Sequence, residues 1–128
     1  MTEAKLPDFD APNLAQAVDQ LPPEAIDSLP FGAIRLDAQG IVRFYSKAEA
    51  RLSGYGPRPV LGRHFFADIA PCMDDPQFRG RIERAQAAGK LDLEFGWFGD
   101  FEAPDRELRV RIQSAPGGGV WIFLRREG

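Results

Sequence analysis

Hydrophobic and polar residues alternate along two stretches in the last third of the chain, residues 91–97 and 108–113. Alternation at every second position is typical of β-strands that bury one face. Residues 31–45 contain two further apolar runs, separated by a turn that ends at Gly40, so this segment predicts a β-hairpin. Residues 120–124 are strongly apolar and follow a glycine-rich turn. The pattern therefore predicts five strands.

Helical spacing and capping residues predict helices before and between these strands. Asp10 can cap an N-terminal helix with apolar residues at helical spacing, and residues 24–29 can form a further turn of helix. Ser46 can cap a short helix after the hairpin. A longer helix is predicted with Pro76 at its first position and Gly89 at its end.

The order of these elements predicts the fold class. A helical N-terminus, two strands, a helical middle and three strands give an α+β domain, in which a five-stranded antiparallel sheet carries helices on one face. The length of 128 residues suits a single domain. Within it, we expect residues 1–28 to form an N-terminal helical cap and residues 29–128 to form the core.

Composition and charge narrow the functional classes. The chain has 16 Lys and Arg against 19 Asp and Glu and no block of like charges, which argues against binding to nucleic acids or anionic membranes. No apolar run approaches the roughly 20 residues that span a bilayer, and the N-terminus does not resemble a secretory signal. Because Cys72 is the single cysteine, an internal disulfide and a cysteine-based zinc site are excluded. We therefore expect a cytoplasmic protein without a metal site.

Four residues could carry chemistry, and each also has an ordinary structural interpretation. Cys72 and the single histidine, His64, could form a thiol enzyme site, although no orienting motif accompanies them, and His64 could ligate a haem. Tyr45 ends a predicted strand and Glu49 follows four residues later, so both side chains can converge on one spot. Taken singly, core packing or solvent exposure explains each of these residues.

Three segments resemble the photoactive yellow protein family. Residues 31–37 are similar to the opening strand of that family, and residues 120–124 to its last strand. Residues 62–72, which read Gly-Arg-His-Phe-Phe-Ala-Asp-Ile-Ala-Pro-Cys, are similar to its chromophore-attachment segment. The likeness runs in register from about Leu29 to Arg126, with a one-residue contraction near Pro116. It implies a PAS fold, whose order of strands and helices matches the order predicted above.

The resemblance implies a blue-light photoreceptor, not an enzyme. Its chromophore would be p-coumaric acid (4-hydroxycinnamic acid), held by Cys72 as a thioester. Tyr45 and Glu49 would hydrogen-bond the phenolate oxygen, and Ser53 would support Tyr45. The other pocket positions that the family implies are Ile34, Tyr55, Phe65, Ala70 and Leu124.

The family also implies a photocycle. Light isomerises the double bond of the chromophore from trans to cis and separates the phenolate from its donors. A protonated, buried Glu49 would then pass its proton to the phenolate, and the carboxylate left behind would loosen the N-terminal cap. An unknown downstream signalling protein would detect this change, and we expect the chain to be a monomer or a weak dimer. The alternative function is a chromophore-free PAS protein-interaction module.

The chain departs from the family pattern at several positions. Tyr55 stands where the family usually has an arginine, so we expect a raised chromophore pKa. Ala103 or Pro104 stands where a methionine is usual, which predicts slow recovery of the dark state. Phe101 and Trp97 replace usual tyrosines and predict altered packing near the ring.

Overall fold

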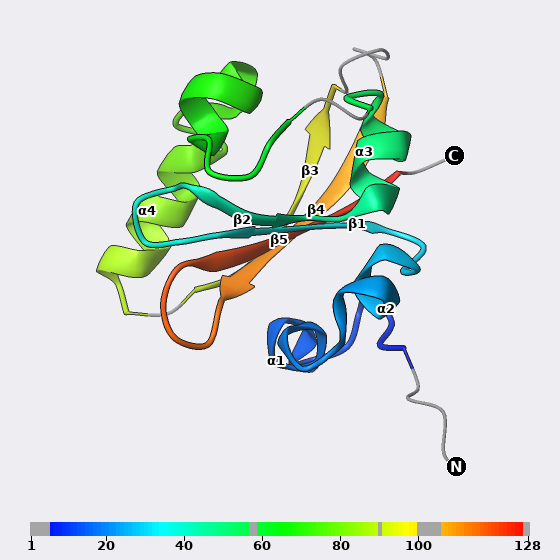
Figure 1. Cartoon of the computed structure of the whole chain (residues 1–128). Helices are drawn as coiled ribbons and strands as arrows, with labels where there is room; N and C mark the ends of the chain where they lie inside the picture. Colours follow the sequence, from blue (N-terminus) through cyan, green and yellow to red (C-terminus); the bar gives the residue numbers. More distant parts are fainter. Residues whose placement is uncertain (1–5, 57–58, 90, 100–105, 127–128) are drawn as a thin grey trace.

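The computed structural model describes residues 6–56, 59–89, 91–99 and 106–126. Its centre is an antiparallel sheet of five strands in the order β2-β1-β5-β4-β3 (Figure 1). The strands are β1 (Gly32–Leu36), β2 (Val42–Tyr45), β3 (Asp92–Phe98), β4 (Glu107–Ser114) and β5 (Val120–Arg126). The first strand pairs with the last, so distant parts of the chain meet at the middle of the sheet. The predicted fold class is confirmed.

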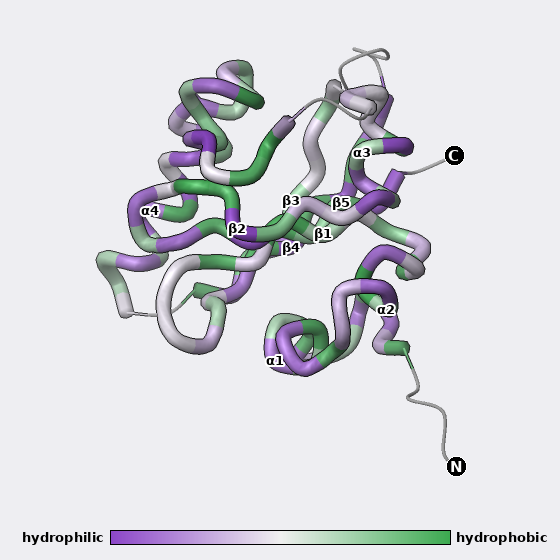
Figure 2. The backbone as a smooth tube through the Cα atoms, viewed as in Figure 1, coloured by the Kyte–Doolittle hydropathy of each residue, from purple (hydrophilic) through white to green (hydrophobic). Residues whose placement is uncertain are grey.

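Helices cover both faces of the sheet (Figure 1). The short helices α1 (Leu14–Asp19) and α2 (Pro23–Asp27) lie on one face. The other face carries α3 (Lys47–Ser53), the π-helical turn η1 (Phe65–Ile69), the 3-10 turn η2 (Pro71–Met73) and α4 (Arg79–Ala87). Green and purple alternate along α1 and α4, as expected for helices that bury one apolar side (Figure 2). Within the described residues, no helix is long and apolar enough to cross a membrane.

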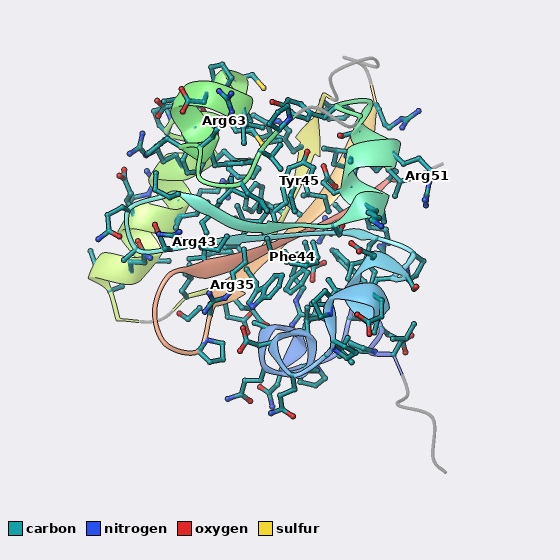
Figure 3. All side chains as sticks on the ribbon, in the orientation of Figure 1. Arg35, Arg43, Phe44, Tyr45, Arg51 and Arg63 are labelled. Carbon is teal, nitrogen blue, oxygen red and sulfur yellow. The ribbon has the colours of Figure 1, made fainter. Side chains whose placement is uncertain are left out.

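Alternation along β5 divides its apolar side chains between two cores. Trp121 and Phe123 belong to the core under α1 and α2, and Ile122 and Leu124 belong to the core on the α3 side. The end of β2 shows the same division, since Phe44 lies on the side of α1 and α2 and Tyr45 lies on the side of α3 (Figure 3). The cap-side core consists of Phe9, Leu14, Ala15, Val18, Ile26, Leu29, Phe31, Ala33, Ala115, Trp121 and Phe123.

Strand β4 buries both of its faces, although the sequence pattern predicted one. Arg111 and Gln113 are 7% and 8% exposed, because the N-terminal segment covers them. Arg111 Nη1 donates to the carbonyl oxygens of Phe9 and Ala11 at 2.7 and 2.5 Å. Gln113 Nε2 donates to the carbonyl oxygen of Pro12 at 3.1 Å. Backbone carbonyls that precede α1 thus find their hydrogen-bond partners on the sheet.

Two predicted helix starts are wrong. The N-cap of α1 is Asn13, whereas Asp10 lies in the preceding turn. The N-cap of α4 is Phe78, so Pro76 lies before the helix. The Asp75 carboxylate accepts the backbone N–H two residues further along at 2.7 Å and holds a turn there. Hydrogen bonds of this kind compete with the first turn of a helix, which explains the later start of α4.

Candidate functional site

A cavity of about 290 Å³ lies on the α3 side of the sheet. Small-molecule pockets usually enclose roughly 300–1,000 Å³, so this cavity suits a small ligand with one aromatic ring. Its lining residues are Ile34, Tyr45, Glu49, Phe65, Ala70, Cys72, Met73, Trp97, Phe98, Gly99 and Leu124. All but Met73 and residues 97–99 were assigned to the pocket from the sequence. The fold therefore brings together residues from β1, β2, α3, η1, η2, β3 and β5.

Cys72 is exposed, which excludes its interpretation as a buried core residue. It lies in the 3-10 turn η2, which begins at Pro71, and it also lines the cavity. The π-helical turn η1 leads directly into η2, and the Ala70 N–H donates to the Phe65 carbonyl oxygen at 2.8 Å. The thiol is therefore reachable from solvent and adjacent to an apolar cavity.

His64 is the N-cap of η1. The imidazole Nδ1 of His64 accepts the Ala67 backbone N–H at 3.1 Å. The backbone N–H of His64 donates to the Asp68 carboxylate at 3.1 Å. His64 is not among the residues that line the cavity with Cys72. Capping thus accounts for this histidine in structural terms, and the geometry does not assemble a pair of Cys72 and His64 in the cavity.

The junction of β2 and α3 brings Tyr45 and Glu49 to the cavity. Ser46 fixes this corner as the predicted N-cap, because its hydroxyl accepts the Glu49 N–H at 3.0 Å and the Ala33 N–H at 3.1 Å. Burial raises the pKa of Tyr45 well above its ordinary value of 10.0, and the negative charge of Glu49 raises it further. Tyr45 therefore keeps its proton and can donate a hydrogen bond into the cavity.

Ser53 and Tyr55 contact Tyr45 but do not line the cavity. The Ser53 hydroxyl is buried, and its hydrogen bond with Tyr45 lowers the pKa of Tyr45, which partly opposes the effect of burial. It also accepts the Tyr55 N–H at 3.1 Å. The ring centroids of Tyr45 and Tyr55 lie 6.0 Å apart. Both residues are therefore placed to act on the cavity through Tyr45.

Glu49 forms a buried ion pair with Arg126 at the end of β5. Nη1 of Arg126 donates to Oε1 of Glu49 at 2.5 Å, and Nη2 donates to Oε2 at 2.9 Å. The side chains of Arg126 and Glu49 are only 9% and 4% exposed. A carboxyl group whose two oxygens both accept from a guanidinium is ionised. In this geometry Glu49 accepts hydrogen bonds from Arg126, and the expectation of a protonated Glu49 beside a bound phenolate stays a prediction.

The sequence analysis missed Arg126 and part of the cavity wall. The predicted last strand ended at Leu124 and gave Arg126 no role, although alternation places Arg126 on the same face as Leu124. Met73 and Phe98 had no signal of their own in the sequence. Trp97 was noted as a departure from the family, and it lines the cavity. Phe101, Ala103 and Pro104 lie outside the described residues.

The part of the chain that the structure describes contains no group of three or more His, Cys, Asp and Glu residues that could hold a metal ion. The chemistry of the cavity therefore depends on one thiol, one phenol, one ion pair and an apolar wall. This combination can hold an aromatic ligand covalently and offer it a small number of polar contacts.

Comparison with known proteins identifies the family. The sequence matches the PAS fold family over residues 20–97. A photoactive yellow protein from Rhodothalassium salexigens is 36% identical over 119 residues, which cover 92% of this chain and 95% of that protein. The chain belongs to the photoactive yellow protein family. A photoactive yellow protein from Halochromatium salexigens is 32% identical over the same shares of the two chains.

Solved structures agree with this assignment. The photoactive yellow protein domain of the sensor histidine kinase Ppr from Rhodospirillum centenum has a TM-score of 0.78 and 37% identity, and the match covers 87% of this chain and 98% of that domain. A PAS domain from Colwellia psychrerythraea, 16% identical, has a TM-score of 0.60 over 81% of this chain and 92% of that domain, and shows the fold alone. The relatives support a PAS-type blue-light photoreceptor rather than an enzyme.

Proposed function

We propose that this chain is a blue-light photoreceptor that carries p-coumaric acid as a thioester on Cys72. The observation that carries the proposal is the position of the thiol, which is exposed to solvent and at the same time lines an apolar cavity. A thiol that must react with an incoming acyl group needs access, and the acyl group then needs a cavity that excludes water. Cys72 meets both requirements.

The attachment step is an acyl transfer. The Cys72 thiolate attacks the carbonyl carbon of an activated p-coumaroyl ester, a new carbon–sulfur bond forms, and the activating group leaves with its electron pair. The thiol proton passes to solvent. Activation of the carboxylic acid is required, because hydroxide is a poor leaving group. The co-substrate is therefore an activated p-coumaroyl thioester or anhydride.

The residues of the cavity fit this acid. Its single ring suits the volume of about 290 Å³ and the apolar side chains of Ile34, Phe65 and Leu124. Its phenolic oxygen requires polar partners, which Tyr45 and Glu49 supply. When bound, p-coumaric acid would supply absorption of blue light and a double bond that isomerises from trans to cis.

The protein's own groups have separate tasks in this proposal. Tyr45 donates a hydrogen bond into the cavity, and Ser53 orients its hydroxyl. Glu49 is held as a carboxylate by Arg126, so it accepts hydrogen bonds in this structure. Proton transfer from Glu49 stays part of the proposal and requires that Glu49 is protonated once the chromophore is bound.

A photoreceptor must also transmit its signal. The relative from Rhodospirillum centenum is a domain of a sensor histidine kinase, and PAS domains act within such signalling proteins. We therefore propose a downstream signalling protein as the partner. The helices α1 and α2, packed against the opposite face of the sheet, are the element whose release would expose a new surface to that partner.

Loading with an activated p-coumaroyl anhydride tests the proposal. The intact mass of the protein should rise by one coumaroyl group, and a blue absorption band should appear. Cys72→Ala should show neither change. His64→Ala, which alters a residue outside the cavity lining, should load like the natural chain. A natural chain that stays colourless with an unmodified thiol would contradict the proposal and favour a chromophore-free PAS interaction module.

A further inference from the structure

A groove of about 440 Å³ lies beside strand β2, outside the cavity that Cys72 lines. It is lined by Asp27 of α2, residues 43–45 at the end of β2, Lys47 of α3 and residues 59–61. Strand β2 is the first strand in the order of the sheet, and among the described strands only β1 pairs with it. The groove therefore lies at an edge of the sheet rather than on one of its faces.

The path of the chain explains why this groove forms. The Val42 N–H donates to the Arg63 carbonyl oxygen at 2.9 Å, and the Gly62 N–H donates to the Val42 carbonyl oxygen at 3.0 Å. The segment before η1 thus pairs with the edge of β2 at Val42. Between residues 43–45 and residues 59–61, all of which the structure describes, no backbone hydrogen bond forms, and both segments line the groove instead.

The backbone of Tyr45 favours an extended segment as the occupant of this groove. Tyr45 lies opposite Ile34 of β1, and the N–H of the next residue, Ser46, donates to the Ala33 carbonyl oxygen at 2.9 Å. In an antiparallel ladder, hydrogen-bonded pairs alternate with pairs that are not hydrogen-bonded. The N–H and C=O of Tyr45 therefore point away from β1, and such groups at a sheet edge can bind an extended peptide as an added strand.

The charges around the groove favour an acidic segment. Arg43 and Lys47 place two cations in its lining, against the single carboxylate of Asp27, which accepts the Lys47 backbone N–H at 2.8 Å. Arg43 pairs with Asp37 at 2.8 Å, yet its side chain is 58% exposed. Within the described residues, the Lys47 ammonium has no carboxylate partner. Carboxylates of a partner would therefore meet complementary charge at this edge, although the whole chain has a net charge of -3.

A second copy of this chain fits the groove less well. A twofold dimer brings the same surface of two subunits together. Arg43 and Lys47 of one subunit would then face the same cations of the other, and like charges across an interface oppose binding. The charge pattern therefore favours a different protein as the occupant.

Tyr45 connects the groove with the cavity. Its side chain lines both of them, and it lies on the α3 side of the sheet, whereas Phe44 reaches the groove from the side of α1 and α2 (Figure 3). A partner in the groove would thus contact a residue that also contacts a ligand in the cavity. If the ligand changes the position of Tyr45, it changes the affinity of the partner, and the partner affects the ligand to the same extent.

We infer that this groove is the docking site for an extended acidic segment of a partner protein. The backbone of the segment pairs with Tyr45, and its carboxylates face Lys47 and Arg43. Its apolar side chains cover Leu61, which is 65% exposed. Docking itself does not depend on a chromophore, whereas its control by light rests on the proposed function.

The first measurement uses the chain without chromophore and the peptide acetyl-Asp-Leu-Glu-Leu-Asp-amide as the probe. Its addition should shift the amide NMR signals of residues 43–47, Val60 and Leu61, and about 300 mM salt should weaken the binding at least threefold. The control peptide acetyl-Lys-Leu-Lys-Leu-Lys-amide should cause no such shifts. No shifts in these residues at about 1 mM peptide, or equal shifts with both peptides, would overturn the inference. Shifts that depend on protein concentration alone would assign the groove to a second copy.

Matched variants separate the groove from net charge. Lys47→Glu should weaken binding of the acidic peptide roughly tenfold, and an acidic residue in the first turn of α3 is compatible with folding. Arg51→Glu makes the same change of charge in the same helix, but Arg51 does not line the groove and points away from Tyr45 (Figure 3). Its effect should stay below about twofold. Equal losses in the two variants would overturn the inference.

The second measurement uses the loaded chain. The affinity for the acidic peptide should differ at least threefold, by an order-of-magnitude estimate, between darkness and blue illumination. Equal affinities in both states would overturn the link between the groove and the cavity. Failure of the chain to load would contradict the proposed function, and the titration of the unloaded chain would still decide whether the groove binds an acidic segment.

Discussion

The two faces of the sheet are built by different means from the same strands. On the face toward α1 and α2, aromatic rings fill the space: the centroids of Phe31 and Phe123 are 6.0 Å apart, and Trp121 stacks on Phe123 at 5.8 Å. On the face toward α3, side chains from seven elements surround a cavity of about 290 Å³ with a buried ion pair at its wall. One face is filled by aromatic rings, and the other combines an apolar core with a cavity.

This difference indicates that one face of the sheet mainly stabilises the fold and the other mainly provides the binding site. Phe123 and Leu124 are neighbours in β5 and both are fully buried, yet one packs under the cap and the other lines the cavity. We expect substitutions on the cap side to change mainly the free energy of unfolding. Substitutions on the cavity side should change mainly the properties of a bound chromophore.

The largest expected effect comes from Phe123→Ala. Removal of this ring should lower the free energy of unfolding by about 3–5 kcal/mol, because it takes away contacts with Phe31 and Trp121 and leaves a void. Leu124→Ala is the matched variant, and we expect a loss of about 2 kcal/mol, since its site already borders a cavity. Urea unfolding measures both values. Equal losses in the two variants would contradict the difference between the faces.

An intermediate effect is expected from Arg111→Leu, which removes the donors to the Phe9 and Ala11 carbonyl oxygens. The loss should be about 1–3 kcal/mol, because buried carbonyl groups are left without partners. Hydrogen exchange should become faster in α1 before it does so in the strands. Arg109→Leu is the control, since Arg109 pairs with Glu94 at an exposed site, and its loss should stay below about 1 kcal/mol. Unchanged exchange in α1 would show that Arg111 does not hold the cap.

The smallest effect concerns Tyr45 and its pKa, which burial raises above the ordinary value of 10.0. At alkaline pH the folded chain retains this proton while the unfolded chain loses it, so the contribution of Tyr45 to stability is complete below pH 10.0 and decreases above it. In Tyr45→Phe, the free energy of unfolding should therefore decrease less steeply as the pH rises above 10. At neutral pH the variant should lose only about 0.5–1.5 kcal/mol of that free energy. Urea unfolding at several pH values above 9 measures the two slopes. Identical slopes would mean that Tyr45 ionises freely in the folded state.

The sequence predicted the sheet and most of the cavity because their signals are local. Alternating apolar positions identified the strands, and the segment that ends in Ala70, Pro71 and Cys72 carried the family resemblance. Ser46 was recognised as a helix cap from its place after β2, and the structure confirms it. Each of these features depends on residues that are close together in the chain, so it can be predicted from a single sequence.

The features that the sequence did not predict depend on residues far apart in the chain. Arg126 meets Glu49 only because β5 pairs with β1, against which α3 packs. Arg111 is buried because the N-terminal segment crosses β4, and an arginine in an alternating strand otherwise faces solvent. The N-cap position of α1 is Asn13 and not Asp10, a shift of three positions that local preference alone does not decide.

Reversible bleaching tests the central claim most directly. The absorption spectrum of the chain loaded with p-coumaroyl anhydride should be recorded in the dark, during blue illumination and again in the dark. The account predicts a blue band that decreases under light and returns slowly in the dark, while Cys72→Ala shows no band at all. A loaded chain whose spectrum does not change under blue light would contradict the assignment as a photoreceptor.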